Sequence, residues 1–242
     1  MIGNMKKNRQ TTFNFKRFSL RNEHSGMKVG TDGVVLGAWA NVPSNGLVLD
    51  VGAGTGLIAL MVAQRTACKV VGIEIDEVAS VEAKENADSS PFRDRVEIIH
   101  TDFVDYATTT NARFDVIVSN PPYFQTGMRA ESNRGVARHE GPLNVRSLID
   151  LGSKILSDNG EISLIAPFEA YDDICFQAVM SKMCVAEKLE IVTRTGRDPI
   201  RVSCRLTKKP TTLRVSTLTI QNSDGSFAEE YINLTKEFYL NF

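Results

Sequence analysis

From Leu47 onward, the chain alternates apolar runs of strand length with amphipathic segments of helix length. This alternation is typical of a parallel β-sheet covered by helices on both faces, so it predicts an α/β fold. Strands are expected at residues 47–51, 69–74, 95–100, 114–119, 161–166, 186–193 and 202–207, with a further one near 213–220. Helices are expected at residues 56–65, 77–88, 145–157 and 168–183.

Composition narrows the class of protein. The chain has 242 residues, which fits one domain, and its formal charge of −1 excludes a simple polycation. The longest strongly apolar stretch, 57–63, is too short to cross a bilayer, and the N-terminus lacks the apolar block of a secretory signal. The four cysteines and three histidines lack zinc-ligand spacing. We therefore expect a cytoplasmic protein with no metal, no membrane contact and no obligate protein partner.

A glycine-rich turn follows the first core strand. Gly52, Gly54 and Gly56 separate that strand from a helix, and glycine lets the backbone approach a ligand closely. The dinucleotide fingerprint would place its third glycine where Leu57 stands. Asp50 would repel a pyrophosphate but suits a cation such as the amino group or sulfonium of S-adenosylmethionine. A tight turn without any ligand is the alternative.

Two further carboxylates end the next strands. Glu74 lies 22 residues after Gly52, where a carboxylate can accept both hydroxyls of a ribose. Asp102 follows the third strand and could accept from an adenine amino group. Solvated charges at strand ends remain the alternative for both residues.

The tetrapeptide Asn120-Pro121-Pro122-Tyr123 follows the fourth strand, so it faces the glycine turn across the sheet edge. The prolines stiffen the backbone. The side-chain carbonyl of Asn120 and the backbone carbonyl of Pro121 can accept both N–H groups of an exocyclic amine and aim its lone pair at a methyl donor. Tyr123 offers a face on which the target base stacks. An ordinary proline turn is the alternative.

These motifs resemble those of S-adenosylmethionine-dependent amino-methyltransferases. The segments 13–20 and 27–40 are more specifically similar to the bacterial tRNA1(Val) (adenine-N6) methyltransferases, which modify the adenine next to the anticodon. Segments 137–140 and 194–199 also resemble that family, so the resemblance covers nearly the whole chain.

The resemblance implies a Rossmann-like fold with a seven-stranded, mostly parallel sheet whose last strand is antiparallel. It implies a single class I methyltransferase domain over residues 1–242, with 1–46 as an N-terminal extension and 47–242 as the catalytic core. It also implies that Thr31 and Asp32 lie beside the methionine part of the cofactor. From the residues alone, Asp32 could equally cap a helix.

Three basic segments stand out against the near-neutral total: residues 6–28, 129–146 and 194–214. The first is interleaved with phenylalanines, a pairing that suits phosphates and unstacked bases, although a solvated surface over core phenylalanines is the alternative. The residues expected to contact RNA are Lys16, Arg17, Arg138, Arg194 and Arg197.

The sequence therefore predicts methyl transfer from S-adenosylmethionine to the N6 amine of an adenine in tRNA. Methylation of a protein glutamine or of an adenine in ribosomal RNA or DNA, an oxidoreductase, and a non-catalytic RNA-binding module are the alternatives. His24 and His139 stand alone, and the proposed chemistry needs neither as a base.

Overall fold

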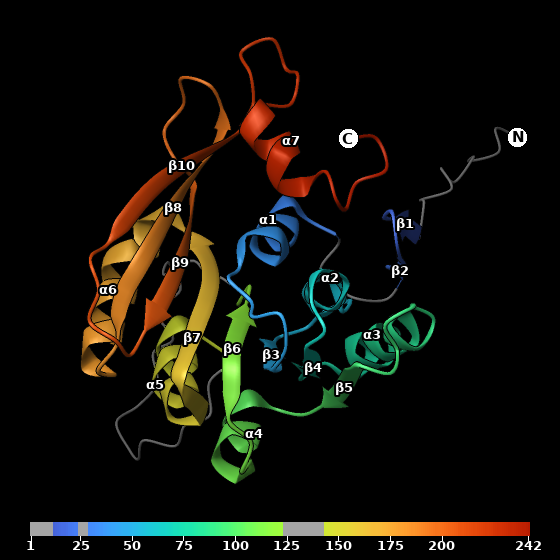
Figure 1. Cartoon of the computed structure of the whole chain (residues 1–242), viewed down its shortest axis with the longest axis vertical. Helices are drawn as coiled ribbons and strands as arrows, with labels where there is room; N and C mark the ends of the chain where they lie inside the picture. The colour runs from blue at the N-terminus through green and yellow to red at the C-terminus, as the bar shows by residue number, and fades with distance from the viewer. Residues whose placement is uncertain (1–11, 24–28, 123–142) are drawn as a thin grey trace, which may run out of the picture.

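The computed structural model describes residues 12–23, 29–122 and 143–242. Within them a main sheet has eight strands in the order β10-β8-β9-β7-β6-β3-β4-β5, and β1 pairs with β2 separately (Figure 1). The strands are β1 (Thr12–Asn14), β2 (Ser19–Arg21), β3 (Leu47–Val51), β4 (Lys69–Glu74), β5 (Val96–His100), β6 (Phe114–Ser119), β7 (Leu156–Pro167), β8 (Cys184–Arg194), β9 (Arg201–Thr207) and β10 (Arg214–Gln221). The helices are α1 (Thr31–Trp39), α2 (Leu57–Arg65), α3 (Glu77–Asp88), α4 (Phe103–Thr109), α5 (Val145–Ile155), α6 (Tyr171–Met180), α7 (Glu229–Thr235) and the 3₁₀ turn η1 (Phe168–Ala170).

The direction of the last strands follows from short connections. Residues 195–200 join β8 to β9 and are too few for a crossover, so β9 runs antiparallel to β8 and to β7. The predicted antiparallel seventh strand is confirmed as β9. An eighth strand, β10, follows after another short connection and lies at the sheet edge, parallel to β8. The described sheet thus has one strand more than the seven that the family resemblance implied, and this strand is the further one expected near residues 213–220.

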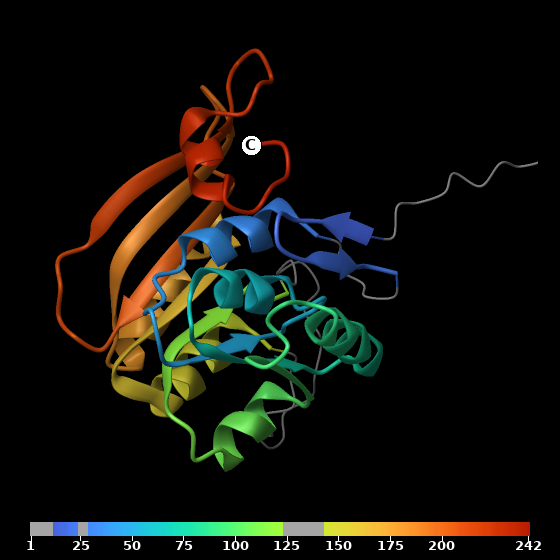
Figure 2. The same cartoon turned by 45° about the vertical axis from the view of Figure 1, so that its right-hand side comes forward.

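Two apolar clusters cover the two faces of the sheet, because side chains alternate along each strand. Along β3, Val48 belongs to the cluster under α1 and α2, whereas Leu49 and Val51 belong to the cluster under α4, α5 and α6. Figures 1 and 2 show the helices on opposite sides of the sheet. The prediction of helices on both faces is confirmed.

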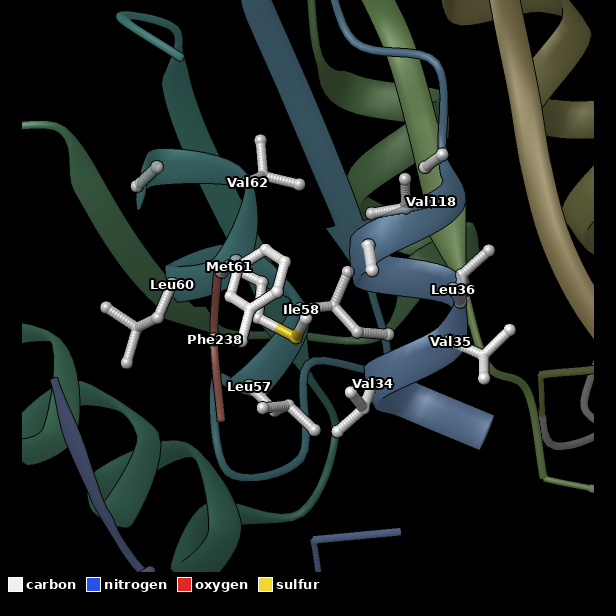
Figure 3. Close-up of a cluster of buried hydrophobic side chains, with 14 of the residues drawn as sticks. Val34, Val35, Leu36, Leu57, Ile58, Leu60, Met61, Val62, Val118 and Phe238 are labelled. Carbon is white, nitrogen blue, oxygen red and sulfur yellow. The ribbon is translucent and has the colours of Figure 1, made fainter. Parts of the chain in front are cut away.

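Helix α1 packs directly against α2. A Cβ atom on Gly37 would lie 2.8 Å from the sulfur of Met61, so a larger residue here would force the Met61 side chain or the helices to shift. Val34 and Ile58 lie between the two helices, and Phe238 from the chain's last segment lies beside Met61 (Figure 3). Residues 31–39 therefore belong to the main core, although they precede the first core strand.

Side-chain caps set where several helices begin. The Asp76 carboxylate accepts from the backbone N–H of Ala79 at the start of α3. Asn144 accepts from the backbone N–H of Ser147 and completes a capping box at the start of α5. Helix α5 ends at Ile155, two residues earlier than expected, because Leu156 already pairs with Phe114 of β6.

Candidate active site

The glycine turn lies at the carboxyl end of β3. Gly52, Gly54 and Gly56 have φ values of 74°, 56° and 81°, in the left-handed region that glycine adopts without a Cβ penalty. The backbone N–H groups of Gly52 and Ala53 both donate to the carbonyl of Ile73, which holds the turn over the end of β4. Gly56 then caps the start of α2. The sequence places three glycines here because the backbone requires them.

Glu74 holds the middle of this turn. Its Oε2 atom accepts from the Gly54 N–H at 2.8 Å, and its Oε1 atom accepts from the Asp76 N–H at 2.9 Å. Only 9% of Glu74 is exposed. The residue also lines the cavity described below, so it lies between the turn and that cavity. One carboxylate thus fixes the loops after two neighbouring strands.

Asp50 points to the α2 side of the sheet. Its Oδ2 atom accepts from the Ala59 N–H at 2.9 Å, while its buried Oδ1 atom has no hydrogen-bond partner among the residues that the structure describes. Burial raises the pKa of Asp50 to about 7, against the opposing effect of the Ala59 N–H, and the nearby charge of Glu74 raises the pKa further. Within the described part of the chain, Asp50 is therefore a buried carboxylate with a single hydrogen-bond donor.

A cavity of about 280 Å³ opens beside the glycine turn. It brings together predicted site residues from the ends of four neighbouring strands: Gly52, Gly54, Glu74, Asp102, Asn120 and Pro122. The sequence reasoning missed the rest of the wall, which is mostly apolar: Val51, Ile73, Ile75, Asp76, Ala79, Thr101, Phe103 and Leu143.

Asn120 lies directly across the sheet edge from the glycine turn. Ser119 is paired with Val51 in the parallel ladder, and its hydroxyl donates to the Val51 carbonyl at 2.8 Å. Asn120 directly follows β6 and Gly52 directly follows β3, and neighbouring strands are about 4.8 Å apart. Pro121 is buried and Pro122 is exposed. Tyr123 lies outside the described residues.

Asp102 has a structural role in addition to its place in the cavity. Its Oδ1 atom caps α4 by accepting from the N–H groups of Val104 at 2.7 Å and Asp105 at 3.3 Å. This helix cap is a sufficient reason for an aspartate at position 102, whether or not it also contacts a ligand. A contact of Asp102 with an adenine stays a prediction.

The sequence is similar to a known family along most of its length. The model of the methyltransferase small domain matches residues 27–190. A tRNA1(Val) (adenine(37)-N6)-methyltransferase from Mannheimia succiniciproducens is 38% identical over 98% of this chain and 97% of its own. The proteins of the same name from Aeromonas hydrophila and Bacteroides fragilis are each 39% identical over 96% of this chain and 98% of their own.

The chain belongs to the tRNA1(Val) (adenine(37)-N6)-methyltransferase family. Solved structures agree on the fold. A predicted O-methyltransferase from Agrobacterium tumefaciens superimposes with a TM-score of 0.69 at 20% identity, over 86% of this chain and 96% of its own. TYW2 of Pyrococcus horikoshii, in complex with MeSAdo, superimposes with a TM-score of 0.54 at 16% identity, over 79% and 69%. The Rossmann-like methyltransferase fold is confirmed.

The two residues that the family resemblance placed near a cofactor, Thr31 and Asp32, begin helix α1. Gly30 is the N-cap of α1, so the alternative in which Asp32 is the cap is wrong. The Asp32 carboxylate instead accepts from Nε of Arg201 at 2.8 Å. Neither residue lines the cavity, and a role of Thr31 and Asp32 at the cofactor stays a prediction.

Lys16 and Arg17 lie away from the cavity of this family member. The guanidinium of Arg17 donates to the Gln64 carbonyl near the end of α2, roughly 10 Å along the helix axis from the glycine turn. The ammonium of Lys16 donates to the carbonyls of Lys236 and Phe242. Arg17 thus lies toward the amino ends of the strands, whereas the cavity lies at their carboxyl ends. This position argues against the prediction that Lys16 and Arg17 hold RNA beside the target base.

The phenylalanines interleaved with these basic residues are mostly core. Phe15 and Phe18 are 4% and 5% exposed, and their rings stack with centroids 4.7 Å apart. Phe13 is partly exposed and contacts the rings of Phe15 and Tyr239. The interpretation of Phe15 and Phe18 as stacking platforms for unpaired bases is therefore wrong.

Arg194 and Arg197 lie at or beyond the carboxyl end of β8, and Asn120 lies at the carboxyl end of β6. Strand β8 runs in the direction of β6, because β9 is antiparallel to both β8 and β7. Three strand spacings, about 14 Å, separate β8 from β6 across the sheet. The register places Lys188 of β8 level with Ser119, so Arg194 lies six residues, about 20 Å, farther along the strand direction. Arg138 lies outside the described residues, as do His24 and His139.

Two negative findings concern the described ranges alone. No group of three or more metal-ligating side chains lies together within residues 12–23, 29–122 and 143–242. Across the same ranges, no helix has the length and apolar character needed to cross a bilayer.

Proposed function

We propose that this chain transfers a methyl group from S-adenosylmethionine to the N6 amine of an adenine in tRNA, namely adenine 37 of tRNA1(Val). The observation that carries the proposal is the shared cavity, which Asn120 lines together with the glycine turn and Glu74. The names of the relatives, at 38% and 39% identity over nearly the whole chain, support the substrate. Because tRNA is the proposed substrate, we infer a cytoplasmic location for this activity.

The residues around the cavity fit S-adenosylmethionine by their chemistry. Gly52 and Gly54 present backbone without side chains, Glu74 presents a carboxylate for ribose hydroxyls, and apolar side chains such as Ile75 and Phe103 suit a purine ring. When bound, the cofactor supplies a methyl group on a positively charged sulfur. The carboxylate of Asp50 is fully buried and is not among the residues that line the cavity, so a contact of Asp50 with that charge stays a prediction.

Asn120 and Pro121 prepare the acceptor. The adenine amine is a poor nucleophile because its lone pair is delocalised into the ring. Two fixed acceptors, the Asn120 side-chain oxygen and the Pro121 carbonyl, draw its N–H groups into a tetrahedral arrangement and localise the lone pair. A new N–C bond forms as the S–C bond breaks, and the extra N–H proton leaves to solvent. The sequence places two prolines here because a mobile backbone would lose this alignment.

The proposed reaction is tested by incubating the chain with bulk tRNA and S-adenosylmethionine labelled in the methyl group, followed by nucleoside analysis. Label in N6-methyladenosine is the expected result. Label in protein, or in a nucleoside other than N6-methyladenosine, contradicts the proposal.

Replacing Glu74 tests the cofactor site. Glu74→Gln retains one carbonyl oxygen but places an NH₂ group against one of the two backbone N–H donors that the carboxylate binds now. We expect S-adenosylmethionine to bind about 10-fold more weakly or worse, as measured by calorimetry. The matched control is Glu97→Gln, at an exposed position on the edge strand β5. Affinity within twofold of wild type for Glu74→Gln would show that this carboxylate does not organise the site.

Replacing the two arginines at the β8–β9 turn tests the RNA surface. We expect the Arg194→Gln/Arg197→Gln protein to bind tRNA more weakly and to lower the salt dependence of binding by about two phosphate contacts. Arg17→Gln, at the opposite sheet edge, serves as the control and should bind tRNA like wild type. An unchanged salt slope in the double variant, or a loss with Arg17→Gln, would place the RNA elsewhere.

A further inference from the structure

An ion pair links two segments that are 169 residues apart in the chain. Nε of Arg201 lies 2.8 Å from Oδ2 of Asp32, and the two side chains are 32% and 30% exposed. Asp32 is in the first turn of α1, and Arg201 is the first residue of β9. The contact therefore joins a helix at the glycine turn to a strand that begins at the basic β8–β9 turn.

On one side of the pair, α1 supports the cofactor site. A Cβ atom on Gly33, the residue after Asp32, would lie 3.0 Å from Leu57. Leu57 is the first residue of α2 and directly follows Gly56 of the glycine turn. The first turn of α1 thus packs against the point where the glycine turn becomes a helix. A shift of the first turn of α1 would therefore displace the backbone of the glycine turn, which faces the cavity.

On the other side, Arg201 is held on a rigid framework. Its backbone pairs with Pro167 at the end of β7 and with Ile191 of β8. The preceding residue, Ile200, donates its N–H to the Ile191 carbonyl and accepts from the N–H of Phe168. The guanidinium also donates from Nη1 to the Ile200 carbonyl at 3.0 Å. Three strands therefore fix the base of the Arg201 side chain.

We propose that Arg201 is a positioning residue for the cofactor site. It holds Asp32 and the first turn of α1 against the glycine turn, and it does so from the strand that carries the arginine-bearing turn. This inference rests on the proposed function. It separates Arg201 from Arg194 and Arg197, which lie in the same basic segment of the sequence: loss of Arg201 weakens cofactor binding, whereas loss of the other two weakens RNA binding.

The test measures cofactor and RNA binding separately. We expect Arg201→Gln to raise the Kd for S-adenosylmethionine by about 2- to 5-fold, the upper part of the range for a partly exposed ion pair. The KM for tRNA should stay within about twofold, as expected for a residue that acts through α1. Arg201→Lys keeps the charge and should restore part of the affinity. Lys154→Gln, which removes the exposed pair with Asp150 on α5, is the control and should change neither constant.

A double-mutant cycle separates positioning from a general loss of stability. If Arg201 acts through Asp32, then Arg201→Gln should add no further loss of cofactor affinity to Asp32→Asn. Additive losses, an unchanged Kd, or a raised KM for tRNA without a change in cofactor Kd would each overturn the inference. A different result would overturn the proposed function. If the wild-type chain binds S-adenosylmethionine but methylates no tRNA, the proposed acceptor is wrong, while the measured cofactor affinities still test the role of Arg201.

Discussion

Asn120→Ala is expected to lower kcat for methyl transfer to tRNA by about 10²- to 10³-fold, the effect of removing one preorganised polar contact at a reacting centre. The alanine leaves Pro121 and Pro122, which stiffen the backbone after position 120, in place. It removes only the oxygen that accepts from the target amine. The glycine turn and Glu74 keep their contacts, so the Kd for S-adenosylmethionine should stay within about twofold. Single-turnover transfer of labelled methyl groups and calorimetry measure the two quantities.

Two further variants serve as controls for this result. Asn120→Asp keeps an acceptor oxygen and should retain more activity than Asn120→Ala. Asn45→Ala changes an asparagine just before β3, at the opposite edge of the sheet, and should transfer methyl groups like wild type. If Asn120→Ala transfers methyl groups at the wild-type rate, Asn120 does not prepare the amine, and the chemistry assigned to this motif is wrong.

Asp50→Asn is expected to change how the stability of the ligand-free protein depends on pH. Burial raises the pKa of Asp50 from 3.8 to about 7 in the folded chain. The unfolded chain therefore loses this proton at lower pH than the folded chain does. The folded state is favoured fully below about pH 4, and this advantage is lost as the pH rises through about 7. The loss is on the order of 4 kcal/mol in the wild type and absent in Asp50→Asn.

The measurement is the difference in free energy of unfolding between wild type and Asp50→Asn at a series of pH values. Constant costs of the amide cancel in the pH dependence, so only the titration of Asp50 remains. Asp94→Asn, at a side chain that is 91% exposed, is the control and should show a flat difference. If the difference in free energy of unfolding between wild type and Asp50→Asn does not change with pH, the pKa of Asp50 is not raised by folding.

The sequence located the parts of the site that depend on local chemistry. Left-handed backbone at Gly52, Gly54 and Gly56 needs glycine, and Asn120 follows from the end of a recognisable strand. Because carboxyl ends of parallel strands meet at one edge, these residues could be placed together before any coordinates. Glu74 was placed correctly at the cavity, but its bonds to the Gly54 and Asp76 backbone were not foreseen.

The sequence did not locate the parts that depend on distant contacts. Helix α1 contains two glycines and buries six of its nine residues, so it shows no amphipathic pattern. The ammonium of Lys16 binds carbonyls more than 200 residues away, which no local pattern indicates. The apolar wall residues Ile75 and Leu143 lie in connections, where an apolar side chain carries no signal of a ligand.

The central claim is that Asn120 and Pro121 hold the target amine at the cavity beside the glycine turn. The most direct test is a structure of the chain with S-adenosylhomocysteine and an anticodon stem–loop of tRNA1(Val). We expect the adenine N6 atom to lie within about 3 Å of both the Asn120 side-chain oxygen and the Pro121 carbonyl, facing the sulfur. An adenine amine bound away from both oxygens, with its sulfur-facing side occupied by another group, would contradict it.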